Sequence, residues 1–150
     1  MKISEEIQRG EVSLGIELGS TRIKAILIGS DNQPIALGGY DWENQLVDGV
    51  WTYSLEEVWT GIQACIAELQ NTLKSEFEVG LTRAKGIGFS AMMHGYLAFE
   101  QAGGQLVPFR TWRNNITGQA AEKLSKLFDY PIPQRWSIAH LYQAILNQEA

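Results

Sequence analysis

Three short segments near the start of the chain are apolar or alternate between apolar and polar residues, a pattern that predicts β-strands. These segments are residues 12–18, 23–28 and 35–42. Residues 19–22 are polar and typical of a hairpin turn, and residues 31–34 are typical of a second turn. The pattern therefore predicts a meander of three strands, with Gly38-Gly39 weakening the third or marking a bulge in it.

A spacing of three to four residues between apolar positions predicts a long amphipathic helix over residues 55–75. Its apolar positions are Val58, Ile62, Ile66, Leu69 and Leu73. Ser54 and Glu57 match a capping box, because Ser54 can accept a hydrogen bond from the first turn and Glu57 can reach back to Ser54. The sequence therefore predicts one long helix that flanks the sheet.

Two shorter helices are predicted near the end of the sequence. The first covers residues 119–128 with Thr117 as its cap, and the second covers residues 138–147 with Ser137 as its cap. The residues expected on the core-facing side of the second helix are Ile138, Leu141 and Ile145. His140 would then lie at the surface or near a helix end, and no role is assigned to it.

A fourth strand is predicted over residues 85–90, and a hairpin over 97–100 and 106–111. Three strands followed by alternating helix and strand favour a mixed α/β sheet with flanking helices over a doubly wound parallel sheet. Residues 86–91 also match G-x-G-x-x-A, but a dinucleotide site needs those glycines to open a helix, with an acidic residue about 20 positions later. We therefore reject a nicotinamide site.

Composition and the absence of certain motifs exclude several classes of function. The sequence has 12 Lys and Arg against 17 Asp and Glu, a net charge of −5, which argues against a nucleic-acid or anionic-membrane partner. The single Cys65 excludes an intrachain disulfide and a multi-cysteine zinc site. Without a signal-like or membrane-length apolar run, a cytoplasmic location is expected. No P-loop motif is present.

The segment after the first strand combines the groups that bind nucleotide phosphates. The residues concerned are Glu17, Gly19, Ser20, Thr21, Arg22 and Lys24. Glycine lets the backbone approach an anion closely, and hydroxyls and cations donate to phosphate oxygens. A carboxylate beside phosphates needs a cation between them, so Glu17 predicts Mg²⁺ held through water. The alternative is an ordinary hairpin turn, against which a buried Glu17 would count.

Three separated motifs resemble the amino-terminal part of the FGGY family of carbohydrate kinases, especially its xylulokinase-like members. Residues 15–24, GIELGSTRIK, are similar to the phosphate hairpin of the sugar kinase, heat-shock-protein and actin superfamily. Residues 86–95, GIGFSAMMHG, and 107–115, VPFRTWRNN, are similar to the strand end and hairpin that follow in the family. The resemblance covers residues 13–146. This resemblance implies a ribonuclease-H-like, actin-type ATPase fold. It also implies a protein that uses ATP and Mg²⁺.

The resemblance also implies a sugar site. Its candidate residues are Met93, His94, Trp112, Arg113 and Asn114. His94 can exchange hydrogen bonds with sugar hydroxyls, and Met93 can pack on a sugar carbon face. Lone histidines and tryptophans are more often structural, so the assignment depends on the resemblance. Four residues depart from the family pattern: Glu17 stands where the family has Asp, which bears on metal binding and activity, and Met92, Asn114 and Thr117 stand where it has Gln, an acid and Arg, which bears on sugar specificity.

A kinase of this family transfers the γ-phosphoryl group of ATP to a sugar hydroxyl, with a ketose such as xylulose the first expectation. The general base of the family is an Asp downstream of this sequence, so no catalytic base is assigned within it. We expect residues 1–11 to be a tail and residues 12–150 a partial kinase domain, inactive alone. Its expected partners are a small sugar, the remaining domain of the same polypeptide and, through exposed apolar surface, a second copy in a homodimer.

Two other functions stay open. One is an ATPase of the same superfamily that couples hydrolysis to a partner's conformation, although such a protein has no need of the Met93-His94 and Trp112 segments. The other is a binding module that keeps the fold without catalysis, which the Glu17 departure leaves open.

Overall fold

The computed structural model describes residues 2–149, which form two compact units. Unit 1 comprises Met1–Glu43 and Glu56–Met92, and unit 2 comprises Asn44–Leu55 and Met93–Ala150. The formal net charge of −5 lies entirely in unit 1, and unit 2 is neutral. Within the described residues, no helix has both the length and the apolar character needed to cross a membrane.

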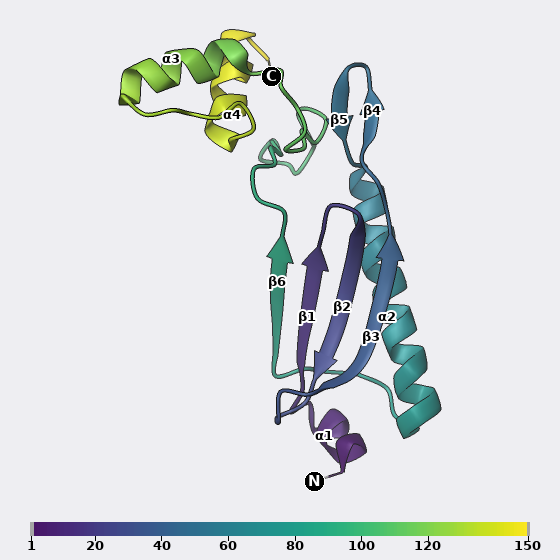
Figure 1. Ribbon diagram of the computed structural model, residues 1–150. Coiled ribbons are helices and arrows are strands. Elements are labelled where there is room, and N and C mark those ends of the chain that lie inside the picture. Colours follow the sequence, from purple (N-terminus) through teal and green to yellow (C-terminus); the bar gives the residue numbers. More distant parts are fainter. Residues whose placement is uncertain (1, 150) are drawn as a thin grey trace. The chain divides into compact units, whose positions relative to one another are not determined.

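A four-stranded mixed sheet forms the centre of unit 1 (Figure 1). Its strands are β1 (Ser13–Leu18), β2 (Arg22–Ile28), β3 (Pro34–Asp41) and β6 (Gly86–Ala91). The strand order is β3-β2-β1-β6, in which β1, β2 and β3 pair antiparallel and β6 pairs parallel to β1. This arrangement confirms the predicted meander and the mixed sheet. The G-x-G-x-x-A residues lie in β6 and open no helix, as expected.

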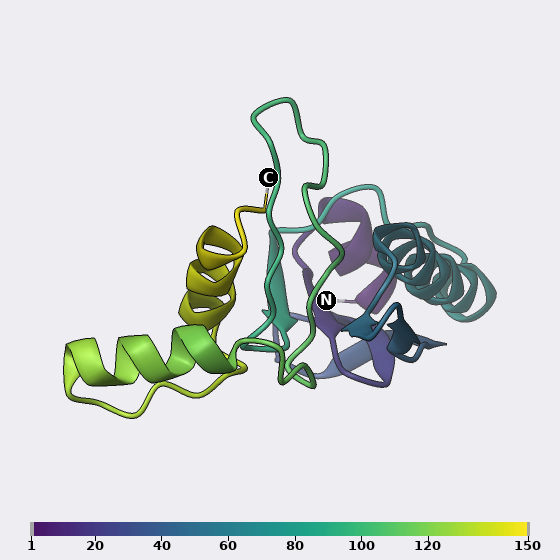
Figure 2. The same cartoon turned by 90° about the horizontal axis from the view of Figure 1, so that it is seen from above.

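The long helix α2 (Leu55–Phe77) lies along one face of this sheet (Figure 2). Its buried residues are Gly61, Cys65, Leu69 and Leu73. Gly38 allows the helix to approach β3, because a Cβ at this position would lie 2.0 Å from the carbonyl oxygen of Cys65. The pairing of β2 with β3 is regular there and shifts instead between Leu27 and Ile28, so the bulge expected at Gly38-Gly39 is absent from this part of the structure.

The first eleven residues contain a helix, α1 (Ile3–Arg9), where the sequence suggested a tail. Gly10 ends it in a left-handed conformation, and Glu6 and Ile7 are buried. The carboxylate of Glu6 accepts a hydrogen bond from the amide of Ser30 in the turn between β2 and β3. This helix is therefore packed into unit 1.

Unit 1 also exposes large apolar side chains. Ile87 and Phe89 of β6 are 59% and 69% exposed, although their partners in β1, Leu14 and Ile16, are buried. Leu37, on β3, is 59% exposed. By strand register, Ile87 and Phe89 share the face of Leu14 and Ile16, whereas Leu37 lies on the opposite face, so unit 1 leaves apolar side chains uncovered on both faces of the sheet.

Unit 2 contains a small hairpin and two helices (Figure 1). Its elements are β4 (Gln45–Val47), β5 (Val50–Thr52), α3 (Gly118–Phe128) and α4 (Ser137–Leu146). The β4–β5 hairpin was not predicted, although Asp48-Gly49 is a strong signal for a two-residue turn, and both residues have positive φ. The hairpin predicted over 97–111 is irregular and has only two isolated bridges, Tyr96 to Arg110 and Phe99 to Gln105.

The buried face of α4 differs from the predicted one. It consists of Ala139, His140, Gln143 and Ala144. The side chains that the helical period placed in the core are exposed: Ile138 by 41%, Leu141 by 51% and Ile145 by 62%. The prediction was wrong because unit 2 packs small and polar side chains inside, and the largest apolar residues do not mark its core.

Two predicted helix caps also have other roles. Thr117 makes no cap hydrogen bond at the start of α3, and its hydroxyl donates to the carbonyl of Gln134 at 2.6 Å. Ser137 is the first residue of α4, and its hydroxyl donates to the carbonyl of Gly95 at 2.9 Å. In unit 2 these hydroxyls join distant segments of the chain, which local sequence cannot indicate.

Candidate functional site

The turn between β1 and β2 is closed by main-chain hydrogen bonds. The amide of Gly19 donates to the carbonyl of Arg22 at 3.0 Å, and the indole nitrogen of Trp42 donates to the carbonyl of Gly19 at 2.7 Å. A Cβ on Gly19 would lie 2.8 Å from the carbonyl oxygen of Arg22, so the turn would have to shift to admit any other residue. The fold thus holds Ser20 and Thr21 at a fixed place at the end of the sheet.

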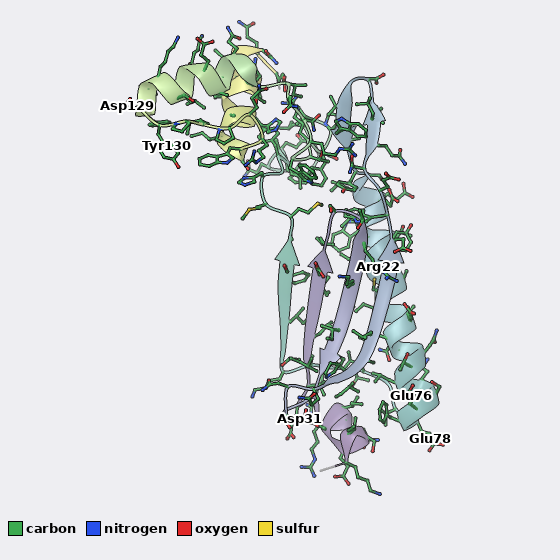
Figure 3. All side chains as sticks on the ribbon, viewed as in Figure 1. Arg22, Asp31, Glu76, Glu78, Asp129 and Tyr130 are labelled. Carbon is green, nitrogen blue, oxygen red and sulfur yellow. The ribbon has the colours of Figure 1, made fainter. Side chains whose placement is uncertain are left out.

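The charged residues of this hairpin pair with each other across strands. Lys24 Nζ lies 3.2 Å from Glu17 Oε2, and Arg22 Nε lies 3.2 Å from Asp41 Oδ1. All four side chains are about half exposed or more. Figure 3 shows Arg22 at the end of the sheet opposite to Asp31. Since Glu17 is exposed and paired, the argument that a buried Glu17 disfavours an ordinary turn does not hold.

Glu17 is the candidate for holding a metal. Within residues 2–149 no three His, Cys, Asp or Glu side chains are placed to hold a metal ion together. Mg²⁺ is commonly bound by one or two carboxylates together with substrate phosphates and water. A single exposed carboxylate beside the turn therefore fits a Mg²⁺ that arrives with a nucleotide, and does not by itself form a metal site.

His94, in unit 2, has a left-handed backbone with φ of 66°. This conformation is uncommon outside glycine, and such residues are often found at functional sites. The ring of His94 stacks on Trp136 with centroids 6.0 Å apart and planes inclined by 8°. The neighbouring Met93 is 72% exposed. His94 is therefore oriented by the residue that precedes α4, and the methionine beside it is open to solvent.

A pocket of about 430 Å³ lies in unit 2. It is lined by Trp112, Arg113, Asn115, Gln134 and Arg135. Two of these, Trp112 and Arg113, are predicted sugar-site residues. The other three were not predicted, and the one available signal was the polar Gln134-Arg135 pair between Pro133 and the predicted last helix.

Asn114 does not line this pocket. It is 1% exposed, and its Oδ1 accepts from the amide of Trp51 at 2.8 Å. Its Nδ2 donates to the carbonyls of Trp51 and Thr111, at 2.7 and 3.0 Å. Both ends of the amide are thus used to join the β5 strand to the loop that carries Trp112 and Arg113, so Asn114 positions this loop.

A second polar cluster in unit 2 surrounds His140. Its ring is fully buried, stacks on Tyr96 at 5.8 Å, and neither nitrogen has a hydrogen-bond partner among the described residues. Burial, reinforced by the nearby Arg110 charge, lowers the pKa of His140 to about 4. Arg110 in turn forms an ion pair with Glu149. His140 is therefore neutral near pH 7 and belongs to the interior of unit 2.

A family model for the FGGY family of carbohydrate kinases, N-terminal domain, matches residues 12–137, which include both the hairpin and the pocket residues. The chain belongs to the FGGY family of carbohydrate kinases. Among curated proteins, none matches its sequence significantly. This FGGY chain combines a glycine hairpin in unit 1 with an arginine-lined pocket in unit 2.

Solved structures share the fold of this FGGY chain. A xyloylose kinase from Brucella ovis is 18% identical, with a TM-score of 0.75 over 91% of this chain and 30% of its own. A xylulose kinase from Rhodospirillum rubrum is 20% identical, with a TM-score of 0.73 over 89% of this chain and 29% of its own. A glycerol kinase from Plasmodium falciparum, solved with ADP, is 16% identical, with a TM-score of 0.75 over 91% of this chain and 29% of its own.

These comparisons confirm the mixed α/β, actin-like fold of the family's N-terminal domain. The FGGY chain spans about 30% of the length of these kinases. At this level of identity the likeness concerns the fold alone, so the roles of individual residues are matters for proposal.

Proposed function

We propose that this chain is the phosphate- and sugar-binding part of an ATP-dependent carbohydrate kinase. The reaction is transfer of the γ-phosphoryl group of ATP to a sugar hydroxyl, and a ketose such as xylulose is the first candidate substrate. The observation that carries this proposal is the family match over residues 12–137, which includes the glycine hairpin. Related folds are named as xylulose and glycerol kinases, so the fold alone does not select the sugar.

In the proposed reaction the hairpin of unit 1 holds the phosphates of ATP. The hydroxyls of Ser20 and Thr21 donate to phosphate oxygens, and Gly19 lets the turn approach them closely. Arg22 and Lys24 are about half exposed and paired with carboxylates. Each of these exposed ion pairs stabilises the chain by only about 0–1 kcal/mol, so a phosphate that binds here can replace the carboxylate as the partner of Arg22 or Lys24. Glu17 would hold Mg²⁺ through water, and bound Mg²⁺ supplies neutralisation of phosphate charge.

Unit 2 supplies the sugar contacts in this proposal. Met93 and Trp112 offer apolar surface to sugar carbons, and His94 and Arg113 offer hydrogen bonds to sugar oxygens. Asn114 acts by positioning the loop, since its amide is already bonded to the main chain. Catalysis of phosphoryl transfer depends mostly on such positioning and on charge neutralisation.

The remaining parts of the reaction are proposed to lie in the rest of the same polypeptide. They are the general base, the adenosine site and the second domain that closes over the substrates. We therefore expect the 150-residue chain to form no sugar phosphate when it is incubated with ATP, Mg²⁺ and a panel of ketoses and polyols. Appreciable product would contradict the assignment of the base to the rest of the polypeptide. A cytoplasmic location and a homodimer stay predictions.

A catalytically silent binding module is the second candidate, because Glu17 stands where the resemblance to the family leads one to expect Asp. Full-length polypeptide separates the two functions. A kinase yields ADP only when a sugar is present, and His94→Asn, a substitution that tolerates the left-handed backbone, should abolish this sugar-dependent formation of ADP. A silent module yields no ADP at all, and an ATPase of the same superfamily yields ADP without sugar. Either of these results would overturn the kinase proposal.

A further inference from the structure

The pocket of unit 2 is formed by two segments that hydrogen bonds hold in place. Trp112, Arg113 and Asn115 follow the irregular hairpin, and Gln134 and Arg135 precede α4. The Thr117 hydroxyl joins the two segments through its 2.6 Å bond to the Gln134 carbonyl. A volume of about 430 Å³ lies in the range of small-molecule sites. The volume of the pocket therefore suits a small-molecule ligand.

The lining of this pocket has two guanidinium groups and no acidic side chain. Arg113 is held by neutral partners: its Cζ lies 3.8 Å from the ring centroid of Trp51, and its Nη1 donates to Asn44 Oδ1 at 3.0 Å. For Arg135, no ion pair occurs within residues 2–149. By contrast, Arg110 and Lys126, also in unit 2, are both paired with glutamates.

Arg113 and Arg135 are both exposed, so water screens their mutual repulsion, but two cations that line one pocket without an acid favour an anion over a neutral ligand. The guanidinium fork fits a carboxylate or a phosphate through paired hydrogen bonds, whereas the hydroxyls of a neutral sugar do not need positive charge. The same pocket also offers groups that suit a polyol. Trp112 is 44% exposed and provides an apolar wall, and Gln134 Oε1 is a buried acceptor without a partner in the described chain.

We propose that this pocket selects an anionic sugar, a polyol that carries one carboxylate or one phosphate, through Arg113 and Arg135. This inference rests on the proposed kinase function and names its substrate class more narrowly than a neutral ketose. Arg113, fixed by Trp51 and Asn44, sets the position of the anionic group, and Arg135 completes the contact from the other segment.

Binding to the 150-residue chain tests the inference by calorimetric titration. The probes are D-gluconate, D-xylulose 5-phosphate, and the neutral compounds D-xylulose and xylitol. We expect at least one anionic probe to bind about ten-fold or more tightly than its neutral counterpart, as two charge-assisted contacts would give. The carboxylate and phosphate probes show which anion is preferred. Equal affinities for anionic and neutral probes, or no measurable binding of either anion, would overturn the inference.

Variants show where the anion binds. Arg135→Gln is expected to lower the affinity for the preferred anion about ten-fold and to lower the affinity for xylitol much less. Lys123→Gln removes one exposed cation of α3, outside the pocket, and should change neither affinity. Arg113→Lys keeps the positive charge but loses the paired hydrogen bonds that a guanidinium group forms with an anion. Thermal unfolding of each variant checks that unit 2 stays folded. An equal loss with Lys123→Gln, or no loss with Arg135→Gln, would contradict the proposed site.

Phosphorylation by the full-length polypeptide separates this inference from the proposed function. If the polypeptide phosphorylates a neutral ketose and leaves the anionic sugars untouched, the substrate inference fails and the kinase function stands. If the anion binds in an Arg135-dependent way but no sugar is phosphorylated, the pocket assignment stands and the kinase function fails.

Discussion

Units 1 and 2 are held together by different kinds of buried side chain. The buried residues of unit 1 are almost all apolar, such as Ile7, Ile23 and Leu69. Of the eight buried polar or charged residues in the described chain, seven lie in unit 2, whose buried apolar residues are mostly alanines. The burial of a polar group is offset only by a well-placed hydrogen bond, which His140 and Gln134 Oε1 of unit 2 lack among the described residues. Unit 2 therefore depends on specific hydrogen bonds, such as those of Asn114, whereas unit 1 depends on apolar burial.

The largest expected effect tests the apolar core of unit 1. Leu69 on α2 is fully buried, so Leu69→Ala should lower the free energy of unfolding by about 2–5 kcal/mol. Leu127→Ala on α3 is the control, because Leu127 is 74% exposed and its loss should change stability by no more than about 0.5 kcal/mol. Urea unfolding followed by circular dichroism measures both. Similar losses for the two variants would show that unit 1 does not depend on this core.

The next effect concerns the buried histidine of unit 2 and its dependence on pH. The pKa of His140 is about 4 in the folded chain against 6.5 unfolded, so the unfolded chain takes up the proton first as pH falls. Stability should therefore fall between pH 6.5 and 4, by about 3 kcal/mol at most, and this contribution should be constant below pH 4.

His140→Phe keeps a ring beside Tyr96 and removes the titrating group. Chemical unfolding at a series of pH values should show that the loss between pH 6.5 and 5 is absent in this variant. A loss nearer pH 4 remains because, despite burial, hydrogen bonds with Asn147 and Arg110 lower the pKa of Glu149. His94→Asn, which removes the other histidine of the sequence, should retain the loss between pH 6.5 and 5. If His140→Phe loses stability over that range as the parent chain does, His140 is not the group that couples unit 2 to pH.

A third effect tests the hydrogen bonds that replace an apolar core in unit 2. Asn114→Ala leaves the part-buried amide of Trp51 without its acceptor, whereas the carbonyl of Trp51 keeps the amide of Thr111 as a donor. One part-buried donor loses its partner, so we expect a loss of about 1–2 kcal/mol in thermal or urea unfolding. Asn115→Ala alters an exposed neighbour and should stay near the parent value. A neutral Asn114→Ala would mean that unit 2 does not depend on this amide.

The smallest effect concerns the glycine hairpin, where main-chain fit matters more than side-chain burial. A methyl group on Gly19 would meet the Arg22 carbonyl at 2.8 Å, so Gly19→Ala should destabilise unit 1 by about 1 kcal/mol. Gly86→Ala in β6 is the matched control, since a Cβ there meets nothing within 4 Å. Equal stabilities of the two variants in urea unfolding would show that the turn adjusts without strain.

The sequence predicts unit 1 well because its core follows periodic rules. Alternation gives β1, β2 and β3, and the helical period gives α2, whose Leu69 and Leu73 are buried as expected. The hairpin residues are also evident, since glycine, hydroxyls and cations occur together in one short segment. Even so, the sequence did not show that Lys24 and Arg22 pair with carboxylates, because pairing depends on strand register.

Unit 2 is predicted poorly for the opposite reason. The apolar period of α4 pointed to Leu141 and Ile145, whereas the structure buries His140 and Gln143. Trp112 and Arg113 were identified by a motif, but the motif did not show that Asn114 is fully bonded to the main chain. Gln134 and Arg135 were missed, because no local pattern joins residue 112 to residue 135.

The sequence by itself determined the family, the mixed sheet and the residues of the glycine hairpin, since these depend on local pattern and short motifs. Only the tertiary structure decided which charges are neutralised and which remain available. In unit 1 the register of neighbouring strands pairs each hairpin cation with a carboxylate. In unit 2 chain folding brings Arg113 and Arg135 into one pocket without an acid, and which charges share a pocket depends on positions in space and not on spacing along the sequence.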